Sequence, residues 1–343
     1  MTAPAVPAEA VRALAPVLGE PEGAPVALAG GITNRNYRLR WGGRDCVLRM
    51  PGKDTELLGI DRRAECAATR AAAAAGIGPP VLAFEPGLGC LVTEFVEGRP
   101  VEPAELRERI PELAAALRTI HAGGELPASF DAFAVVEQYR RIAEARGAAP
   151  PPGFGELADG AHSIRAALSG PEHAPVPCHN DLLSANLLDD GRRLRILDWE
   201  YAGMGDRHFD LANLAANNGF TDAHDEVLLD DGRRLRILDW EYAGMGDAHF
   251  DLGNVAANNG FTEADDEALL DAYWPGGCTS RRLAALRLMR VMSDFREGMW
   301  GVVQATVSEL EFDFAGYAAE HLGRVAAALA DPRLATWLED ARG

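Results

Sequence analysis

Alternating apolar and polar positions in the first hundred residues predict a small antiparallel sheet. Strands are expected over residues 26–28, 37–41, 45–50, 81–84 and 90–95, with glycine-containing turns between them. The run DRRAECAATRAAAAA at 61–75 is dense in strong helix formers and predicts one helix, which the following glycines and prolines end. An amphipathic helix rather than a signal peptide is expected near the N-terminus, because the apolar stretch there contains charged residues and no basic leader.

Beyond residue 100 the apolar positions take a helical period. Helices are expected within 102–121 and 131–146, and a proline-rich loop follows at 148–153. The pattern therefore predicts an α+β fold with two lobes. These are a small antiparallel-sheet N-lobe at 1–93, a hinge at 94–100 and a larger, mainly helical C-lobe at 101–343.

A tandem repeat occupies the middle of the helical lobe. Residues 187–227 recur as 228–268, forty-one residues further on, with differences at six positions. Two copies are too few for a solenoid, so the repeat indicates a duplication inside a fold that needs one copy. The motif at 179–186 continues directly into the first copy, and use of the second copy instead would enlarge a loop at a cost of about 2 kcal/mol. The fold needs one such segment, and the first copy is therefore expected to form its beginning and the second copy its end.

Charge and composition narrow the possible partners. The formal net charge is −19, which opposes binding to the phosphate backbone of nucleic acids or to an anionic membrane. Five scattered cysteines without a Cys-x-x-Cys pair indicate buried thiols in a reducing compartment. No uninterrupted apolar run reaches the roughly 18 residues that a membrane span needs. A cytoplasmic protein that binds neither nucleic acid nor membrane is therefore expected.

The candidate chemistry lies just before the repeat. The run from His179 to Asn186 has the form H-x-D-x-x-x-x-N, and a strand ending in Asp198 follows it. Phosphoryl transfer needs a carboxylate that accepts the proton of the attacking hydroxyl, and hard oxygen ligands that hold magnesium. Asp181 fits the first role, whereas Asn186 and Asp198 fit the second. The alternative is that His179 and Asp181 only cap a loop and that Asp198 is a turn residue.

Together with stretches elsewhere in the chain, this motif resembles the choline and ethanolamine kinase branch of the aminoglycoside phosphotransferase (kinase-like) superfamily. The matching stretches are GGITNRNYRL, VLRMPG, IDRRAE, LVTEFVEG, CHNDLLSANLL, ILDWEYAGMGDRHFDLAN and MWGVVQATVSELEFDFAGYA. The resemblance implies a protein-kinase-like fold with ATP at the hinge and Asp181 as the catalytic base. It also implies that Asn186 and Asp198 bind magnesium, with Asp239 of the second copy as the alternative to Asp198.

The same resemblance implies a set of nucleotide-binding residues. They are Thr33, Asn34, Asn36, Arg49, Glu65, Glu94 and Phe95. The first three lie in a glycine-led segment that resembles a phosphate loop, although such a segment also fits an ordinary hairpin, and the last two lie at the hinge. Arg49 and Glu65 resemble the phosphate-binding cation and its ion-pair partner. An arginine thus stands where kinases usually carry lysine, and its planar fork binds phosphate differently.

Acceptor-binding and bracing residues are also implied. Aromatic faces with a carboxylate suit an ammonium group, and Tyr201, Tyr242 and Trp300 match family positions of that kind. An ordinary place in the core is the alternative for each of them. Structural roles in holding the catalytic loop are implied for His179 and for Asp210 or its twin Asp251, and a helix N-cap is the alternative for this aspartate.

Departures from the family pattern bear on the acceptor. Glu297 stands where a second tryptophan is expected, and Asn258-Asn259, or Asn217-Asn218, replace an acidic and aromatic pair. The predicted function is ATP- and magnesium-dependent transfer of the γ-phosphate to a hydroxyl of a small molecule, with a choline- or ethanolamine-like amino alcohol favoured. The alternatives are an aminoglycoside or other small-molecule kinase and a non-catalytic ATP-binding protein disabled by the duplication. A metal phosphohydrolase is a more distant alternative.

Overall fold

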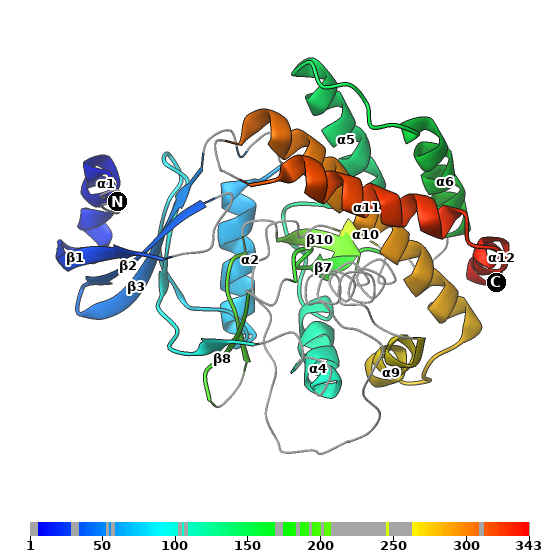
Figure 1. Ribbon diagram of the computed structural model, residues 1–343. Coiled ribbons are helices and arrows are strands. Elements are labelled where there is room, and N and C mark those ends of the chain that lie inside the picture. Colours follow the sequence, from blue (N-terminus) through cyan, green and yellow to red (C-terminus); the bar gives the residue numbers. More distant parts are fainter. Residues whose placement is uncertain are drawn as a thin grey trace.

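The protein, described here by a computed structural model, has a sheet lobe and a helical lobe (Figure 1). This arrangement confirms the α+β fold with a small sheet-containing N-lobe and a larger helical C-lobe. The residues that the structure describes are 6–28, 34–52, 55, 59–101, 105, 109–168, 174–182, 186–191, 194–199, 202–206, 245–246, 263–308 and 312–342.

Five antiparallel strands form the sheet of the N-lobe. They are β1 (Pro21–Ala27), β2 (Asn34–Trp41), β3 (Arg44–Pro51), β4 (Val81–Glu85) and β5 (Cys90–Glu94), in the spatial order β1-β2-β3-β5-β4. All five expected strands are present. β1 begins earlier than expected, at Pro21, because an edge strand tolerates prolines that a central strand excludes.

Side chains of this sheet alternate between its two faces, as strand geometry requires. Tyr37 and Trp41 of β2 lie in a buried cluster that helix α1 (Ala8–Leu18) covers with Leu14. The opposite face carries Asn36 of β2 and borders a cavity. One face therefore stabilises the lobe, and the other is available for a ligand.

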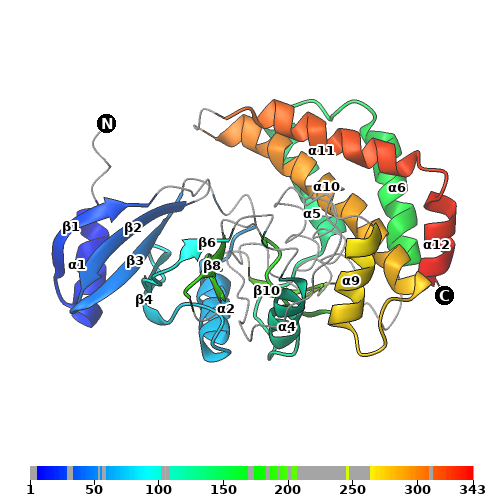
Figure 2. The ribbon, with the colours of Figure 1, turned by 60° about the horizontal axis from the view of Figure 1, so that its bottom comes forward.

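Helix α2 (Arg62–Ala74) begins where the sequence predicts. The side chain of Asp61 caps it by accepting hydrogen bonds from the backbone N–H groups of Arg63 and Ala64, at 2.8 and 3.1 Å. Figure 2 shows α2 between the sheet and the helical lobe. The helix thereby brings the buried Glu65 of its first turn to the cavity side of β3.

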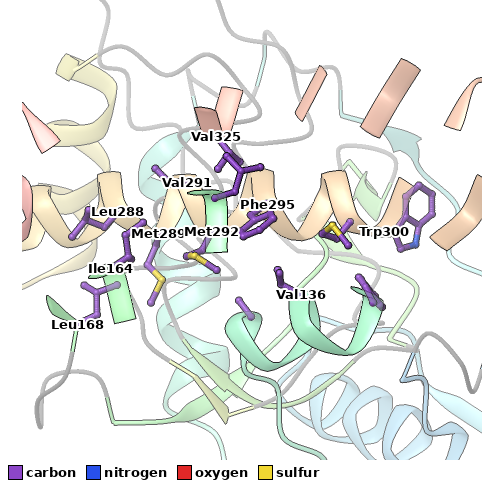
Figure 3. Close-up of a cluster of buried hydrophobic side chains, with 14 of the residues drawn as sticks. Val136, Ile164, Leu168, Leu288, Met289, Val291, Met292, Phe295, Trp300 and Val325 are labelled. Atoms are coloured by element: carbon purple, nitrogen blue, oxygen red, sulfur yellow. The ribbon is translucent and has the colours of Figure 1, made fainter. Parts of the chain in front are cut away.

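A long central helix organises the C-lobe. The described helices of this lobe are α4 (Ile110–His121), α5 (Ala132–Ala145), α6 (Phe154–Ala167), α9 (Glu263–Tyr273), α10 (Ser280–Val307), α11 (Phe314–Leu329) and α12 (Leu334–Arg342). α10 has 28 residues and contributes Leu288, Met292 and Phe295 to a buried cluster, where they pack with Val136 of α5 and Ile164 of α6 (Figure 3). This shared core holds α5, α6, α11 and α12 against α10.

Two small sheets carry the segment with the candidate chemistry. β7 (Val176–Cys178) pairs antiparallel with β10 (Gly203–Asp206), and β8 (Leu187–Asp189) pairs antiparallel with β9 (Leu194–Ile196). β6 (Arg99–Pro100) pairs with β8 on its other side, so the last two residues of the expected hinge form a strand. The segment between β7 and β8 is thus held at both ends.

The two copies of the repeat contact each other at one described point. β11 (Met245–Gly246) of the second copy pairs parallel with β10 of the first copy, with Gly205 opposite Met245. The first copy supplies β8, β9 and β10, whereas the second copy continues into α9. Most of the remaining second copy lies outside the described residues.

All five cysteines lie in the described part of the chain and carry free thiols. Four of them are buried, as the sequence predicts, and Cys278 is half-buried. Burial raises the pKa of Cys90 to about 11, so this thiol stays protonated at neutral pH. Among the helices that the structure describes, none combines the length and the apolarity of a membrane-crossing segment.

Candidate active site

A cavity of about 210 Å³ lies where the N-lobe sheet, the hinge and the segment around β8 and β9 meet. Its lining combines apolar side chains, among them Val47, Leu91 and Val96, with polar side chains from both lobes. The polar lining residues are Asn36, Arg49, Thr69, Thr93, Asn186 and Asp198. An apolar wall beside convergent polar groups is typical of a site for a small organic ligand.

Asp181 lies in the loop between β7 and β8, and only 4% of it is exposed. Its backbone N–H donates a hydrogen bond to Nδ1 of His179 at 3.2 Å. Its backbone carbonyl accepts a hydrogen bond from Nδ2 of Asn186, also at 3.2 Å. The two other members of the motif therefore fix the backbone of Asp181 in the loop.

Burial keeps His179 neutral. The side chain is fully buried, and this burial, with the positive charge of Arg49 as a second cause, holds the pKa of His179 well below its ordinary value. A neutral ring that accepts a hydrogen bond at Nδ1 carries its proton on Nε2. The ring also packs against Trp199, with ring centres 5.6 Å apart. His179 thus braces the loop beside Asp181.

Two residues of the site have left-handed backbone conformations. Among the described residues other than glycine, only Asn180 and Asp198 have positive φ angles, 66° and 67°. Asparagine and aspartate adopt this region more readily than other side chains, and such conformations persist where their surroundings hold them. The neighbouring Leu197 helps to fix the backbone at Asp198, because the N–H of Leu197 donates to the carbonyl of Asn186 at 3.3 Å. The bend keeps Asp198 beside Asn186 in the cavity wall.

Arg49 of β3 joins two carboxylates. Its Nη1 atom lies 3.0 Å from Oε1 of Glu65 and also contacts Oδ1 of Asp198. Nη1 of Arg62 lies 3.0 Å from the other carboxylate oxygen of Glu65. Because Glu65 is 1% exposed, its charge needs such partners. Arg62 was not predicted, although its i,i+3 spacing to Glu65 on α2 is a signal for this pairing.

Asn186 and Asp198 bring two oxygen-bearing side chains to one wall of the cavity. Since Asn186 uses its amide nitrogen toward Asp181, its amide oxygen remains for a cation. Magnesium usually takes one or two protein oxygens and completes its shell with water and phosphate. In the described part of the chain, no three or more His, Cys, Asp or Glu side chains gather around a metal position. A magnesium ion shared with a phosphate group therefore fits this pair.

An aromatic and acidic cluster lies on α10 and α11. Trp300 packs against Tyr317, with ring centres 5.7 Å apart. The hydroxyl of Tyr317 donates to Oε2 of Glu297 at 2.8 Å, and Arg296 contacts the other oxygen of Glu297. Burial, and then the charge of Glu297, raise the pKa of Tyr317 well above its ordinary value, and the charge of Asp181 adds to this rise. Tyr317, which was not predicted as a site residue, is thus within electrostatic reach of Asp181.

The predicted nucleotide-binding residues divide into three groups. Asn36, Arg49 and Phe95 line the cavity. Glu65 supports Arg49 from behind, Asn34 is buried at the start of β2, and Glu94 is exposed at the end of β5 without lining the cavity. The remaining predicted residues, Thr33, Tyr201, Asp210, Asp239, Tyr242 and Asp251, lie outside the described residues.

Known proteins with similar sequences include small-molecule kinases. Ethanolamine kinase 2 of Mus musculus is 33% identical over 184 residues, which are 50% of this chain and 46% of that protein. The chain thus spans about half the length of the curated relatives that it matches. Among solved structures, a choline/ethanolamine kinase family protein from Mesorhizobium loti has a TM-score of 0.71 and 28% identity, with 97% of this chain and 98% of that chain covered.

A second solved structure and a family model extend the comparison. LicA in complex with AMP has a TM-score of 0.68 at 21% identity, with 94% of this chain and 97% of that chain covered, and supports the fold alone. A model described as APH, the phosphotransferase enzyme family, matches residues 26–236 and 220–289. Because these matches take in more than half of the residues, the chain belongs to this phosphotransferase enzyme family.

Proposed function

We propose that this protein is an ATP- and magnesium-dependent kinase that phosphorylates a hydroxyl group of a small amino alcohol. The observation that carries the proposal is the arrangement of three side chains around one hairpin. Asp181 has its backbone fixed by its motif neighbours, while Asn186 and Asp198 stand together in the wall of the adjoining cavity. This arrangement offers a base for the hydroxyl and two oxygens for a phosphate-bound cation.

The cavity has the chemistry that ATP needs. Its apolar wall beside the hinge suits a flat ring, and Arg49 supplies a positive charge for the phosphates. Asn36 also lines the cavity, and its buried side-chain oxygen has no hydrogen-bond partner within the described residues. Rotation of that amide exchanges its oxygen and nitrogen, so it presents either an acceptor or a donor to a ligand. LicA, a structural neighbour in fold, is known with AMP bound.

The chain's own residues have separate tasks in the proposed reaction. Asn186 and Asp198 would hold magnesium, which when bound would neutralise charge on the phosphates. Asp181 accepts the proton of the acceptor hydroxyl while the hydroxyl oxygen bonds to the γ-phosphorus and the bond from that phosphorus to ADP breaks. His179 keeps the backbone of Asp181 in place without exchanging protons, because burial keeps its ring neutral.

The cluster on α10 and α11 favours an acceptor with an amine. Trp300 and Tyr317 bring two aromatic rings together beside the carboxylate of Glu297, which Arg296 also contacts. Ammonium groups bind to such combinations of aromatic rings and carboxylates. The relatives named as ethanolamine kinase or as choline/ethanolamine kinase family members point the same way. A choline- or ethanolamine-like amino alcohol is therefore the proposed acceptor.

The test is release of ADP from ATP and magnesium with candidate acceptors. Choline, ethanolamine, thiamine, simple sugars and aminoglycosides are each assayed with the unmodified chain, Asp181→Asn and the exposed control Asp159→Asn of α6. Turnover with an amino alcohol is expected, with a loss of at least about a hundredfold in kcat for Asp181→Asn and none for Asp159→Asn. Turnover with aminoglycosides only would show that the acceptor is an aminoglycoside and not an amino alcohol. ADP binding without turnover of any acceptor would identify a non-catalytic protein.

A further inference from the structure

The guanidinium group of Arg38 covers a hinge residue that lines the cavity. The Cζ atom of Arg38 lies 3.7 Å from the centre of the Phe95 ring. Phe95 follows β5 directly and is part of the cavity lining, whereas Arg38 is not. Arg38 therefore adjoins the cavity through the Phe95 ring and does not line it.

Strand register explains how two residues 57 positions apart in the sequence meet. Arg38 of β2 lies opposite Val47 of β3, and Val47 lies opposite Thr93 of β5. Val47 and Thr93 both line the cavity, so this row of side chains belongs to the ligand-facing side of the sheet. Phe95, two positions beyond Thr93, extends the same face toward the hinge.

Two hydrogen bonds and a backbone bond fix the position of Arg38 relative to the hinge. Nη2 of Arg38 donates to Oδ2 of Asp45 and to Oε1 of Glu97, both at 2.8 Å. The backbone N–H of Phe95 donates to the carbonyl of Asp45, also at 2.8 Å. The side chains of Asp45 and Glu97 are 50% and 81% exposed, so water screens both ion pairs, and the ring contact is the main tie between Arg38 and the hinge.

We infer that Arg38 is a positioning residue for the nucleotide base, because it holds the Phe95 ring in the wall of the cavity. This inference rests on the proposed function, in which the cavity binds ATP. The ring forms part of a preorganised surface when Arg38 stacks on it, and a preorganised surface loses less entropy when a ligand binds. Arg38 therefore acts on the affinity for nucleotide and not on the transfer step.

The neighbouring arginine of the same strand provides a matched control. Arg40 also lies on β2, two residues further along the same face, and its side chain is 60% exposed. Arg40 forms an ion pair with Glu22 of β1, at 3.3 Å, and not with the hinge. Removal of Arg40 takes the same charge from the same strand and leaves Phe95 with its stacking partner.

Isothermal titration with ADP and magnesium tests the inference on the full chain. The Kd for ADP is expected to rise about threefold to tenfold in Arg38→Ala, to rise less in Arg38→Lys and to stay unchanged in Arg40→Ala. In the acceptor assay, KM for ATP is expected to rise in Arg38→Ala while kcat stays within about twofold of the unmodified chain. If Arg38→Ala instead lowered kcat and the melting temperature together with the ADP affinity, Arg38 would support the fold in general and the inference would be wrong.

A double-mutant cycle with Phe95→Leu identifies the route of the effect. If Arg38 acts through the ring, Arg38→Ala adds no further loss of ADP affinity in a Phe95→Leu background. Equal losses in both backgrounds, an unchanged Kd in Arg38→Ala, or an equal loss in Arg40→Ala would each overturn the inference while ADP binding stands. Absence of ADP binding by the unmodified chain would overturn the proposed function, and the inference with it.

Discussion

The buried, neutral ring of His179 makes the folding stability of the chain depend on pH. In the folded chain its pKa lies well below the ordinary value of 6.5, whereas unfolding exposes the ring to water and restores that value. Below about pH 6.5 the unfolded chain therefore binds a proton that the folded chain does not bind, and folding stability falls as the pH falls. One such proton accounts for up to about 1.4 kcal/mol per pH unit. Above this range His179 adds no pH dependence.

Replacement of His179 should remove this contribution. We expect His179→Gln to be less stable than the unmodified chain at pH 7.5, because it lacks the ring that packs on Trp199 and the Nδ1 acceptor for Asp181. The difference in melting temperature should narrow at pH 5.5. Thermal unfolding followed by circular dichroism measures both values, with the exposed His162→Gln of α6 as the control. A difference that is the same at both pH values would contradict the neutral, buried state.

Packing between elements depends on a glycine where α10 meets α11. A Cβ atom at Gly298 of α10 would lie 2.7 Å from Cγ of Leu322 on α11, too close for an ordinary contact. We expect Gly298→Ala to destabilise the fold by about 1–3 kcal/mol, as overpacking of a core does. Gly323→Ala on α11 is the matched control, since a Cβ there meets nothing within 4 Å, and it should stabilise the helix by about 0.5–1 kcal/mol. Denaturant midpoints of the two variants should therefore shift in opposite directions.

At the scale of the whole molecule, the repeat offers two aspartates for the one metal position that we propose. Asp198 of the first copy lies in the cavity wall beside Asn186, whereas Asp239 of the second copy lies outside the described residues. We expect Asp198→Ala to lower kcat at least about a hundredfold and Asp239→Ala to leave it nearly unchanged, because loss of a metal ligand removes charge stabilisation in the transition state. Steady-state assays compare the two variants, with the acceptor that the ADP-release assay identifies. Loss of activity from Asp239→Ala alone would assign the site to the second copy.

Elements with strong local patterns were predictable from the sequence. The five strands of the sheet lobe and α2 have alternating or helical periods and clear end signals, such as the Asp61 cap. The loop between β7 and β8 contains the H-x-D-x-x-x-x-N motif, whose spacing alone identified its polar residues as site candidates. α6 was not predicted, because its apolar positions alternate with Gly155, Gly160 and polar side chains and give only a weak helical stripe.

Contacts between distant residues were not predictable in the same way. Arg38 and Glu97 are 59 positions apart, and no local pattern indicates that they pair. Tyr317 reaches Glu297 only because α11 packs along α10. A single sequence shows the residue types but not the register or the helix packing that brings them together. Arg62 is the exception, since its partner Glu65 lies one turn away on the same helix.

The two-sided sheet has a consequence for how this protein can change over evolutionary time. Odd-numbered positions of β2, such as Tyr37 and Trp41, are buried under α1, whereas Asn36 faces the cavity and Arg38 contacts Phe95. Substitutions of Tyr37 or Trp41 should therefore reduce the amount of folded protein, whereas substitutions of Asn36 or Arg38 should change the cavity wall and leave the fold intact. A lineage can therefore vary the residues on the cavity side of the strand while the buried residues between them keep the lobe intact.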